Sequence, residues 1–166
     1  MTEYRRLPPL GATYFFTVRL DRCGATLLTD HIDALRYAYA KAVQEYPVIC
    51  HAMVVLPDHM HAVWTEPAGG VWYPERWRRI KARFAHAVAD PVQPGAAVRR
   101  EGGVWQRRFQ ERALQSEDAY RQAIEQCRMN PVKHGLVAEA GQWPYSSFAK
   151  GRQPHKAAAP NVMAMA

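Results

Sequence analysis

The chain has 166 residues, a length that favours one domain with a single core and no need for covalent staples. Lys and Arg total 22 against 15 Asp and Glu, and this surplus of +7 favours a polyanionic partner over a merely solvated basic surface. The three cysteines form no C-x-x-C pair, which disfavours a disulfide framework or a cysteine zinc site and fits a reducing cytoplasm.

The first half of the chain alternates strand and helix patterns. Residues 12–20 are rich in aromatic and β-branched side chains, which predicts a strand. Apolar residues then recur at helical spacing over about 31–46, and Pro47 ends this expected helix. Two apolar runs on either side of the Pro57-Asp58 turn predict a β-hairpin. Its strands cover 48–56 and 59–65.

The second half predicts a helix over about 75–89, a strand over 104–114 and a last helix over about 117–129. Ser116 is a good N-terminal cap for the last helix. Asn130-Pro131 is expected to end it, because proline disfavours helical backbone at the residue before it.

The resulting order is β-α-β-β-α-β followed by a C-terminal helix. This order indicates an α+β, ferredoxin-like (split βαβ) fold, in which an antiparallel sheet carries helices on one face. Residues 1–150 are expected to form this single domain, and residues 151–166 a mobile tail. No apolar run approaches the ~18 residues of a membrane span, and residues 1–10 lack the apolar core of a signal peptide.

His59 and His61 lie two residues apart on the predicted strand 59–65. The two-residue repeat of a strand directs both imidazoles to one side of the sheet, with Met60 and Ala62 directed to the other. Two neutral imidazoles can bind one divalent ion and leave coordination positions open. The alternative is a pair of surface or hydrogen-bonded histidines without a metal, because H-x-H alone is a weak motif.

Four segments together resemble a known family. They read VVLPDHMHAVW, WQRRF, NPVKHGLV and WPYSSF. With them the chain, from Tyr4 through Phe148, resembles the HUH single-tyrosine transposases, and within them the branch of REP-associated tyrosine transposases, which act on repetitive extragenic palindromes. The resemblance implies the ferredoxin-like fold that the element order also predicts.

The resemblance also implies a reaction. His59 and His61 would hold Mg²⁺ or Mn²⁺, which polarises the scissile phosphate of single-stranded DNA beside a hairpin. A tyrosine on the C-terminal helix would attack the phosphorus and form a 5′-phosphotyrosine link. The polar residue four positions later, which here is Asn130, would complete the metal shell. No nucleotide cofactor and no membrane partner are implied, and a monomer is favoured over a homodimer.

The chain departs from the family pattern at the nucleophile. The residue four positions before Asn130 is Gln126, whose amide cannot form a phosphodiester link. Tyr120 is the tyrosine of the expected last helix, about 120° around the helix axis from Gln126. It shares its face with Ala123 and Cys127, so it is either a core tyrosine or, after a shift of helix register, a substitute nucleophile.

Several cations are candidates for contacts with DNA phosphates. They are Arg5, Arg6, Arg79, Arg83, Arg107, Arg108, Lys133 and His134. The alternative for each is a solvated position or an internal ion pair. Trp72, in a loop with glycine and proline, is the candidate for stacking on an unpaired base.

Three functions therefore stay open. The first is metal-dependent nicking and rejoining of DNA through a phosphotyrosine. The second is a DNA-binding family member without strand transfer, because Gln126 stands at the nucleophile position. The third is an RNA-binding ferredoxin-like module, which the absence of an RNP1-like segment disfavours.

Overall fold

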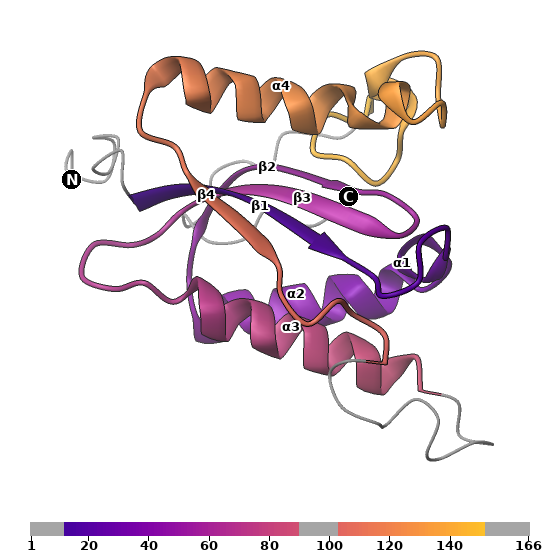
Figure 1. Ribbon diagram of the computed structural model, residues 1–166, viewed down its shortest axis with the longest axis horizontal. Coiled ribbons are helices and arrows are strands. Elements are labelled where there is room, and N and C mark those ends of the chain that lie inside the picture. Colours follow the sequence, from indigo (N-terminus) through magenta and orange to yellow (C-terminus); the bar gives the residue numbers. More distant parts are fainter. Residues whose placement is uncertain (1–11, 90–102, 152–166) are drawn as a thin grey trace.

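The structure is a computed structural model that describes residues 12–89 and 103–151, so Arg5, Arg6 and the expected tail from residue 152 lie outside it (Figure 1). In chain order the elements are β1 (Thr13–Arg19), α1 (Leu27–Asp30), α2 (Ile32–Glu45), β2 (Ile49–Val55), β3 (His59–Thr65), α3 (Tyr73–Ala87), β4 (Gln110–Ala113), α4 (Glu117–Lys133) and the 3-10 helix η3 (Ala140–Gln142).

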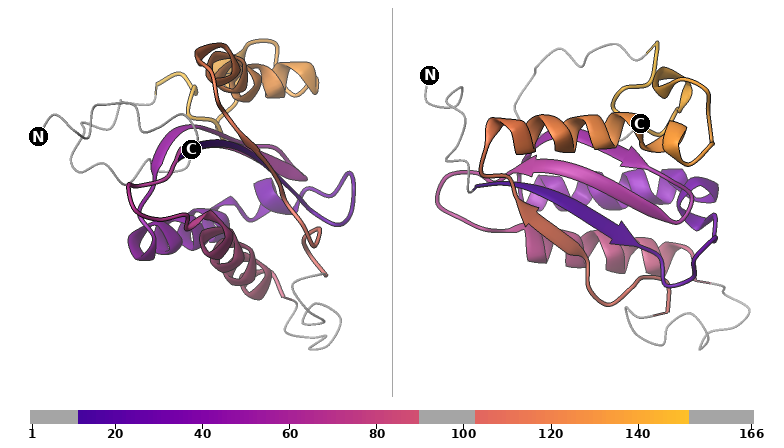
Figure 2. Two further views of the ribbon diagram at one scale, coloured as in Figure 1. Left: turned by 60° about the vertical axis from the view of Figure 1, so that its left-hand side comes forward. Right: turned by 45° about the horizontal axis from the view of Figure 1, so that its top comes forward.

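The four strands form one sheet in the order β2-β3-β1-β4, and all neighbouring strands are antiparallel. Helices α2 and α3 cover one face of this sheet, and α4 crosses the other face over β2 and β3 (Figures 1 and 2). The predicted ferredoxin-like fold with an added C-terminal helix is thus confirmed. None of the helices in the described segments is long and apolar enough to cross a membrane.

The side chains of β3 divide between two cores, one on each face of the sheet. Met60 and Trp64 belong to the larger core beneath α2 and α3, where the Trp64 ring stacks on Trp77 of α3 with centroids 4.4 Å apart. Val63 belongs to the smaller core beneath α4, together with Cys127. Because side chains alternate along a strand, His59 and His61 lie on the same face as Val63, the face that α4 covers.

The predicted last strand is too long, since β4 covers only Gln110–Ala113. Trp105, which lies within the predicted strand, forms an isolated bridge with Leu20 instead. Its indole N–H donates to the carbonyl of Lys81 at 3.1 Å, and its ring packs edge-on against Phe84. Burial of this large side chain against α3 therefore takes the segment out of the regular strand pairing.

The prediction that Asn130-Pro131 ends the last helix is wrong, because α4 continues through Pro131 to Lys133. Proline removes one backbone donor here, and the helix ends with a glycine cap a few residues later. Gly135 has φ 71°, and its N–H donates to the Val132 carbonyl at 2.9 Å. The N–H of Leu136 donates to the Pro131 carbonyl at 2.9 Å, which completes a Schellman motif.

Candidate nucleic-acid and metal site

The two motif histidines lie beside one another at the start of β3. Their ring centroids are 5.2 Å apart and their planes are nearly perpendicular, at 82°. Across the β1–β3 pairing, His59 is opposite Arg19 and His61 is opposite Thr17. Both rings are almost fully buried, at 4% and 3% exposure. The strand alternation therefore places two imidazoles in one small, protected space.

Each ring is oriented through its Nδ1 atom. His59 Nδ1 lies 2.6 Å from Asp58 Oδ1, and the other oxygen of this carboxylate accepts the Gly24 N–H at 3.0 Å. His61 Nδ1 lies 2.9 Å from the Thr17 hydroxyl. These contacts leave the Nε2 atom of each ring for a ligand. Partners of this kind fix the ring orientation and the tautomer of metal-binding histidines.

Both histidines are held in the neutral form. Burial lowers the pKa of His61 to about 3, and the charge of the Arg19 guanidinium acts in the same direction, as would that of His59 if it were protonated. Burial also lowers the pKa of His59, against the opposing effect of the Asp58 carboxylate. A neutral imidazole keeps a free lone pair near pH 7, and this lone pair is what a metal ion requires.

His134 is brought to the same place by the end of α4. It is the C-terminal cap residue of the helix, and its ring lies against His59 with centroids 5.0 Å apart. A cavity of about 280 Å³ opens beside the rings of His59 and His134, and Asp58 and Leu136 also form part of its wall. The three extra residues of α4 beyond Asn130 are what position this exposed imidazole.

Asn130 contributes an oxygen that lacks a partner. Its side chain is 6% exposed, and no described residue hydrogen-bonds to its Oδ1. Its main-chain carbonyl accepts the His134 N–H at 3.0 Å, so Asn130 lies one helical turn from the histidine that contacts His59. Buried oxygens are nearly always paired, so this one marks a place for a cation or a hydrogen-bond donor.

The two imidazoles could share one divalent ion. The remaining coordination positions of that ion would be filled by water, by phosphate oxygens or by an amide oxygen such as that of Asn130. Within residues 12–89 and 103–151, no three side chains of His, Cys, Asp or Glu gather closely enough to hold a metal by themselves.

Tyr120 lies at the other end of this sheet face. Its hydroxyl is 3.2 Å from His51 Nδ1, and His51 Nε2 is 2.7 Å from the Thr65 hydroxyl. Thr65 is four residues along β3 from His61, a separation of about 13 Å in a strand. The ring packs against the smaller core, and burial raises the pKa of the phenol. The geometry therefore gives Tyr120 the role of a packed tyrosine, away from the paired histidines.

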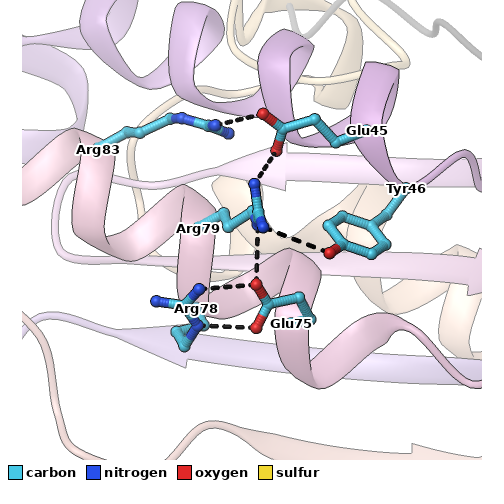
Figure 3. A network of polar contacts seen from close by, with 6 residues as sticks. All are labelled: Glu45, Tyr46, Glu75, Arg78, Arg79 and Arg83. Atoms are coloured by element: carbon cyan, nitrogen blue, oxygen red, sulfur yellow. Dashed lines mark hydrogen bonds and ion pairs between the residues drawn. The ribbon is translucent and has the colours of Figure 1, made fainter.

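The cations of α3 also lie away from the histidines, on the opposite face of the sheet. Arg79 binds Glu75 and Glu45 at 2.8 and 2.9 Å, and Arg83 binds Glu45 at 2.6 Å (Figure 3). Because α3 covers the opposite face, the structure does not bring Arg79 or Arg83 to the histidine site. Both guanidinium groups are also bound by glutamates within the helix layer. Trp72 belongs to the same region, where its ring lies 5.7 Å from that of Tyr46.

Arg107, Arg108 and Lys133 are exposed, and none forms an ion pair with another described residue. Lys133 is the last residue of α4 and precedes His134, which places it at the same end of the helix as the histidine site. Arg107 and Arg108 lie in the segment that leads into β4. These three candidates keep the free charge that a phosphate contact requires.

The sequence analysis did not select two arginines that the structure places near the histidines. Arg19 is exposed opposite His59, close enough for its charge to lower the pKa of both motif histidines. The Arg112 guanidinium lies over the Phe15 ring at 5.2 Å, and that ring stacks on His61 at 5.2 Å. Only the strand register brings these arginines to the site, because both are distant from His61 in sequence.

The ferredoxin-like sheet, the paired histidines on its inner strand and the helix crossing above them define an HUH transposase domain. Comparison with known proteins identifies the branch. The sequence is 40% identical to a REP-associated tyrosine transposase of Escherichia coli over 148 residues, which make up 89% of this chain and 83% of the relative. It is 35% identical over 151 residues to a putative REP-associated tyrosine transposase of Haemophilus influenzae, across 89% and 86% of the two chains.

A solved structure of a REP-associated tyrosine transposase bound to a REP hairpin matches the fold with a TM-score of 0.74 at 37% identity. The match covers 100% of this chain and 98% of the other. No model of a known protein family matches the chain. The chain belongs to the REP-associated tyrosine transposase family, which confirms the resemblance drawn from its motifs.

Proposed function

We propose that this protein binds single-stranded DNA beside REP-like hairpins. The observation that carries the proposal is the neutral pair His59 and His61 with two arginines near it, neither of which has an acidic partner among the described residues. The charge of Arg19 reaches both rings, and Arg112 lies over the Phe15 ring that stacks on His61, so either guanidinium would contact a phosphate bound there. The solved relative bound to a REP hairpin supports the same class of DNA.

His59, His61 and the unpaired oxygen of Asn130 are the residues that would hold Mg²⁺ or Mn²⁺. The bound ion would polarise a phosphate oxygen as a Lewis acid. Asp58 and Thr17 hold the two rings in place through Nδ1, so the Nε2 atoms need little reorganisation to bind. Arg19 and Arg112 would orient the DNA backbone over the pair.

The strand-transfer step lacks its nucleophile on α4. Gln126 stands at the family's nucleophile position, and the Tyr120 hydroxyl is held by His51 at the far end of β3. A phosphotyrosine route would require Tyr120 to leave its contact with His51, which is bound to Thr65, four residues along β3 from His61. The function that the geometry supports best is therefore DNA binding without a covalent protein–DNA intermediate.

A labelled hairpin oligonucleotide with a single-stranded flank tests both the proposed DNA binding and the proposed loss of strand transfer. We expect salt-sensitive binding in fluorescence anisotropy, and no adduct in a denaturing gel after incubation with Mn²⁺. Gln126→Tyr is expected to produce the adduct, and adding His61→Ala to that variant is expected to remove it. A covalent adduct with the unmodified protein would refute the loss of strand transfer. Equal or tighter binding of the matched RNA hairpin would favour the RNA-binding alternative.

A further inference from the structure

The chain that leads into β4 forms a bulge where it passes the end of β1. The regular pairing of β1 with β4 ends at Thr17 opposite Gln110, and the next pair along β1 is the bridge of Leu20 with Trp105. Two residues of β1 therefore face the four residues 106–109, which we call the edge bulge. Bulges at the edges of sheets re-aim side chains that a regular strand would direct along the ladder.

The edge bulge is anchored at both of its ends. Phe109 packs against the larger core, where its ring centroid lies 6.0 Å from that of Phe16 and 6.2 Å from that of Trp77. At the other end, the N–H of Gln106 donates to the Arg19 carbonyl at 3.0 Å. The two residues between these anchors are exposed.

A buried lysine of α3 holds the backbone of the edge bulge. Lys81 is 7% exposed, and its Nζ donates to the Gln106 carbonyl at 2.9 Å, with the Arg107 carbonyl at 3.5 Å. A buried ammonium group is costly unless its protons are hydrogen-bonded, and the bonds made by a charged donor are strong. Lys81 therefore restrains the backbone from which Arg107 and Arg108 extend.

The side chains that this backbone presents are cations with free charge. Arg107 and Arg108 are exposed, and neither forms an ion pair with another described residue. Arg19, to which the bulge is hydrogen-bonded, is opposite His59 in the β1–β3 pairing. Because neighbouring strands are about 4.8 Å apart, the bulge lies two strand spacings, or roughly 10 Å, from β3. The two arginines are thus close enough to the histidine pair to contact the same DNA.

We propose that Lys81 is a positioning residue, which fixes the edge bulge so that Arg107 and Arg108 bind phosphates of the DNA backbone beside the histidine pair. The ammonium group of Lys81 is buried against the bulge, so it acts through the two arginines and makes no contact with DNA. Two guanidinium groups on a fixed backbone lose less conformational freedom on binding than two on a loose loop. This inference rests on the proposed function, because it requires the protein to bind the hairpin.

The test compares variants by fluorescence anisotropy with the labelled hairpin. Lys81→Met keeps the length of the side chain but removes its donors, and we expect it to weaken hairpin binding about tenfold. Lys81→Gln retains N–H donors and should recover part of this loss. The matched control Lys41→Met removes one charge from an exposed position on α2 and should weaken binding less than about twofold. Circular dichroism checks that each variant is folded.

A double-mutant cycle separates positioning from a general structural role. Arg107→Gln combined with Arg108→Gln should weaken binding and reduce the salt dependence of log K by about 2. In this background Lys81→Met should weaken binding no more than Lys41→Met does, because no arginine of the bulge is left to position.

Equal losses from Lys81→Met in both backgrounds overturn the proposal, since Lys81 then acts independently of the arginines. Unchanged affinity and salt dependence in the double arginine variant, which alters only exposed side chains, overturn it as well. Both outcomes leave the proposed function intact, because the unmodified protein still binds the hairpin. Absence of binding by the unmodified protein overturns the proposed function, and the role of Lys81 with it.

Discussion

The two faces of the sheet use arginine in opposite ways. On the face of α2 and α3, Arg76 is fully buried against Glu66, and its guanidinium also donates to the Tyr46 and Pro47 carbonyls. Farther along α3, acidic side chains bind the arginines in a continuous network (Figure 3). On the face of α4, Arg19 and Arg112 approach a pair of neutral histidines, and neither has an acidic partner among the described residues.

The comparison shows that the net charge of +7 does not by itself identify a DNA surface. The arginines that look most like a basic stripe, on α3, share acidic partners and hold two helices together, since Glu75 and Glu45 bind Arg78, Arg79 and Arg83. The arginines with free charge are scattered in sequence and gather only through strand pairing. Local compensation, more than the number of cations, separates ligand-facing arginines from structural ones.

The largest effect is expected from breaking the buried pair on the α2–α3 face. Arg76→Ala leaves Glu66 buried without its partner and should lower the free energy of unfolding by about 3–5 kcal/mol. Urea unfolding followed by circular dichroism measures this change. The control Arg121→Ala disrupts an exposed pair with Glu117 and should cost less than about 0.5 kcal/mol. Equal losses in the two variants would show that burial does not set the strength of these pairs.

A smaller effect is expected from removing single charges on the α4 face. Arg19→Ala and Arg112→Gln should each weaken hairpin binding and reduce the salt dependence of log K by about 1, because each removes one phosphate contact. Arg79→Ala, on the other face, should leave both quantities unchanged. Anisotropy titrations between about 50 and 200 mM salt provide the measurement. If Arg79→Ala changed the salt dependence as much as Arg19→Ala, the distinction between the faces would fail.

The local parts of the architecture could be predicted from the sequence. Strand alternation and turn residues predicted the hairpin with both histidines on one face, and the structure places them there. The extent of β4 could not be predicted, since the burial of Trp105 against α3 depends on the assembled core. The continuation of α4 through Pro131 depends on a cap made by Gly135, four residues later.

The charged surroundings of the site were beyond sequence reasoning for a similar reason. Arg79 and Arg83 meet Glu45 across 34 and 38 residues of chain, and no local pattern indicates this pairing. Arg19 reaches His59 only through the register of β1 with β3. The motif itself predicted His59 and His61, because their relationship is local to one strand, whereas the neighbouring charges are fixed by long-range contacts.

The smallest expected effect concerns His51, on the α4 face but distant from the histidine pair. Its ring is hydrogen-bonded between Tyr120 and Thr65, and burial lowers its pKa. The unfolded chain then binds this proton more readily than the folded protein, so the contribution of His51 to stability is complete above about pH 6.5 and falls as the pH drops below it. The glutamine side chain introduced by His51→Gln cannot be protonated in this pH range. We therefore expect the Tm of this variant to fall less than that of the unmodified protein between pH 7.5 and 5.5, with a difference between the two falls of roughly 2–4 °C.

The exposed His86 provides the control, since His86→Gln should keep the pH response of the unmodified protein. Identical responses for both variants would mean that the buried Tyr120–His51–Thr65 contact is not sensitive to acid.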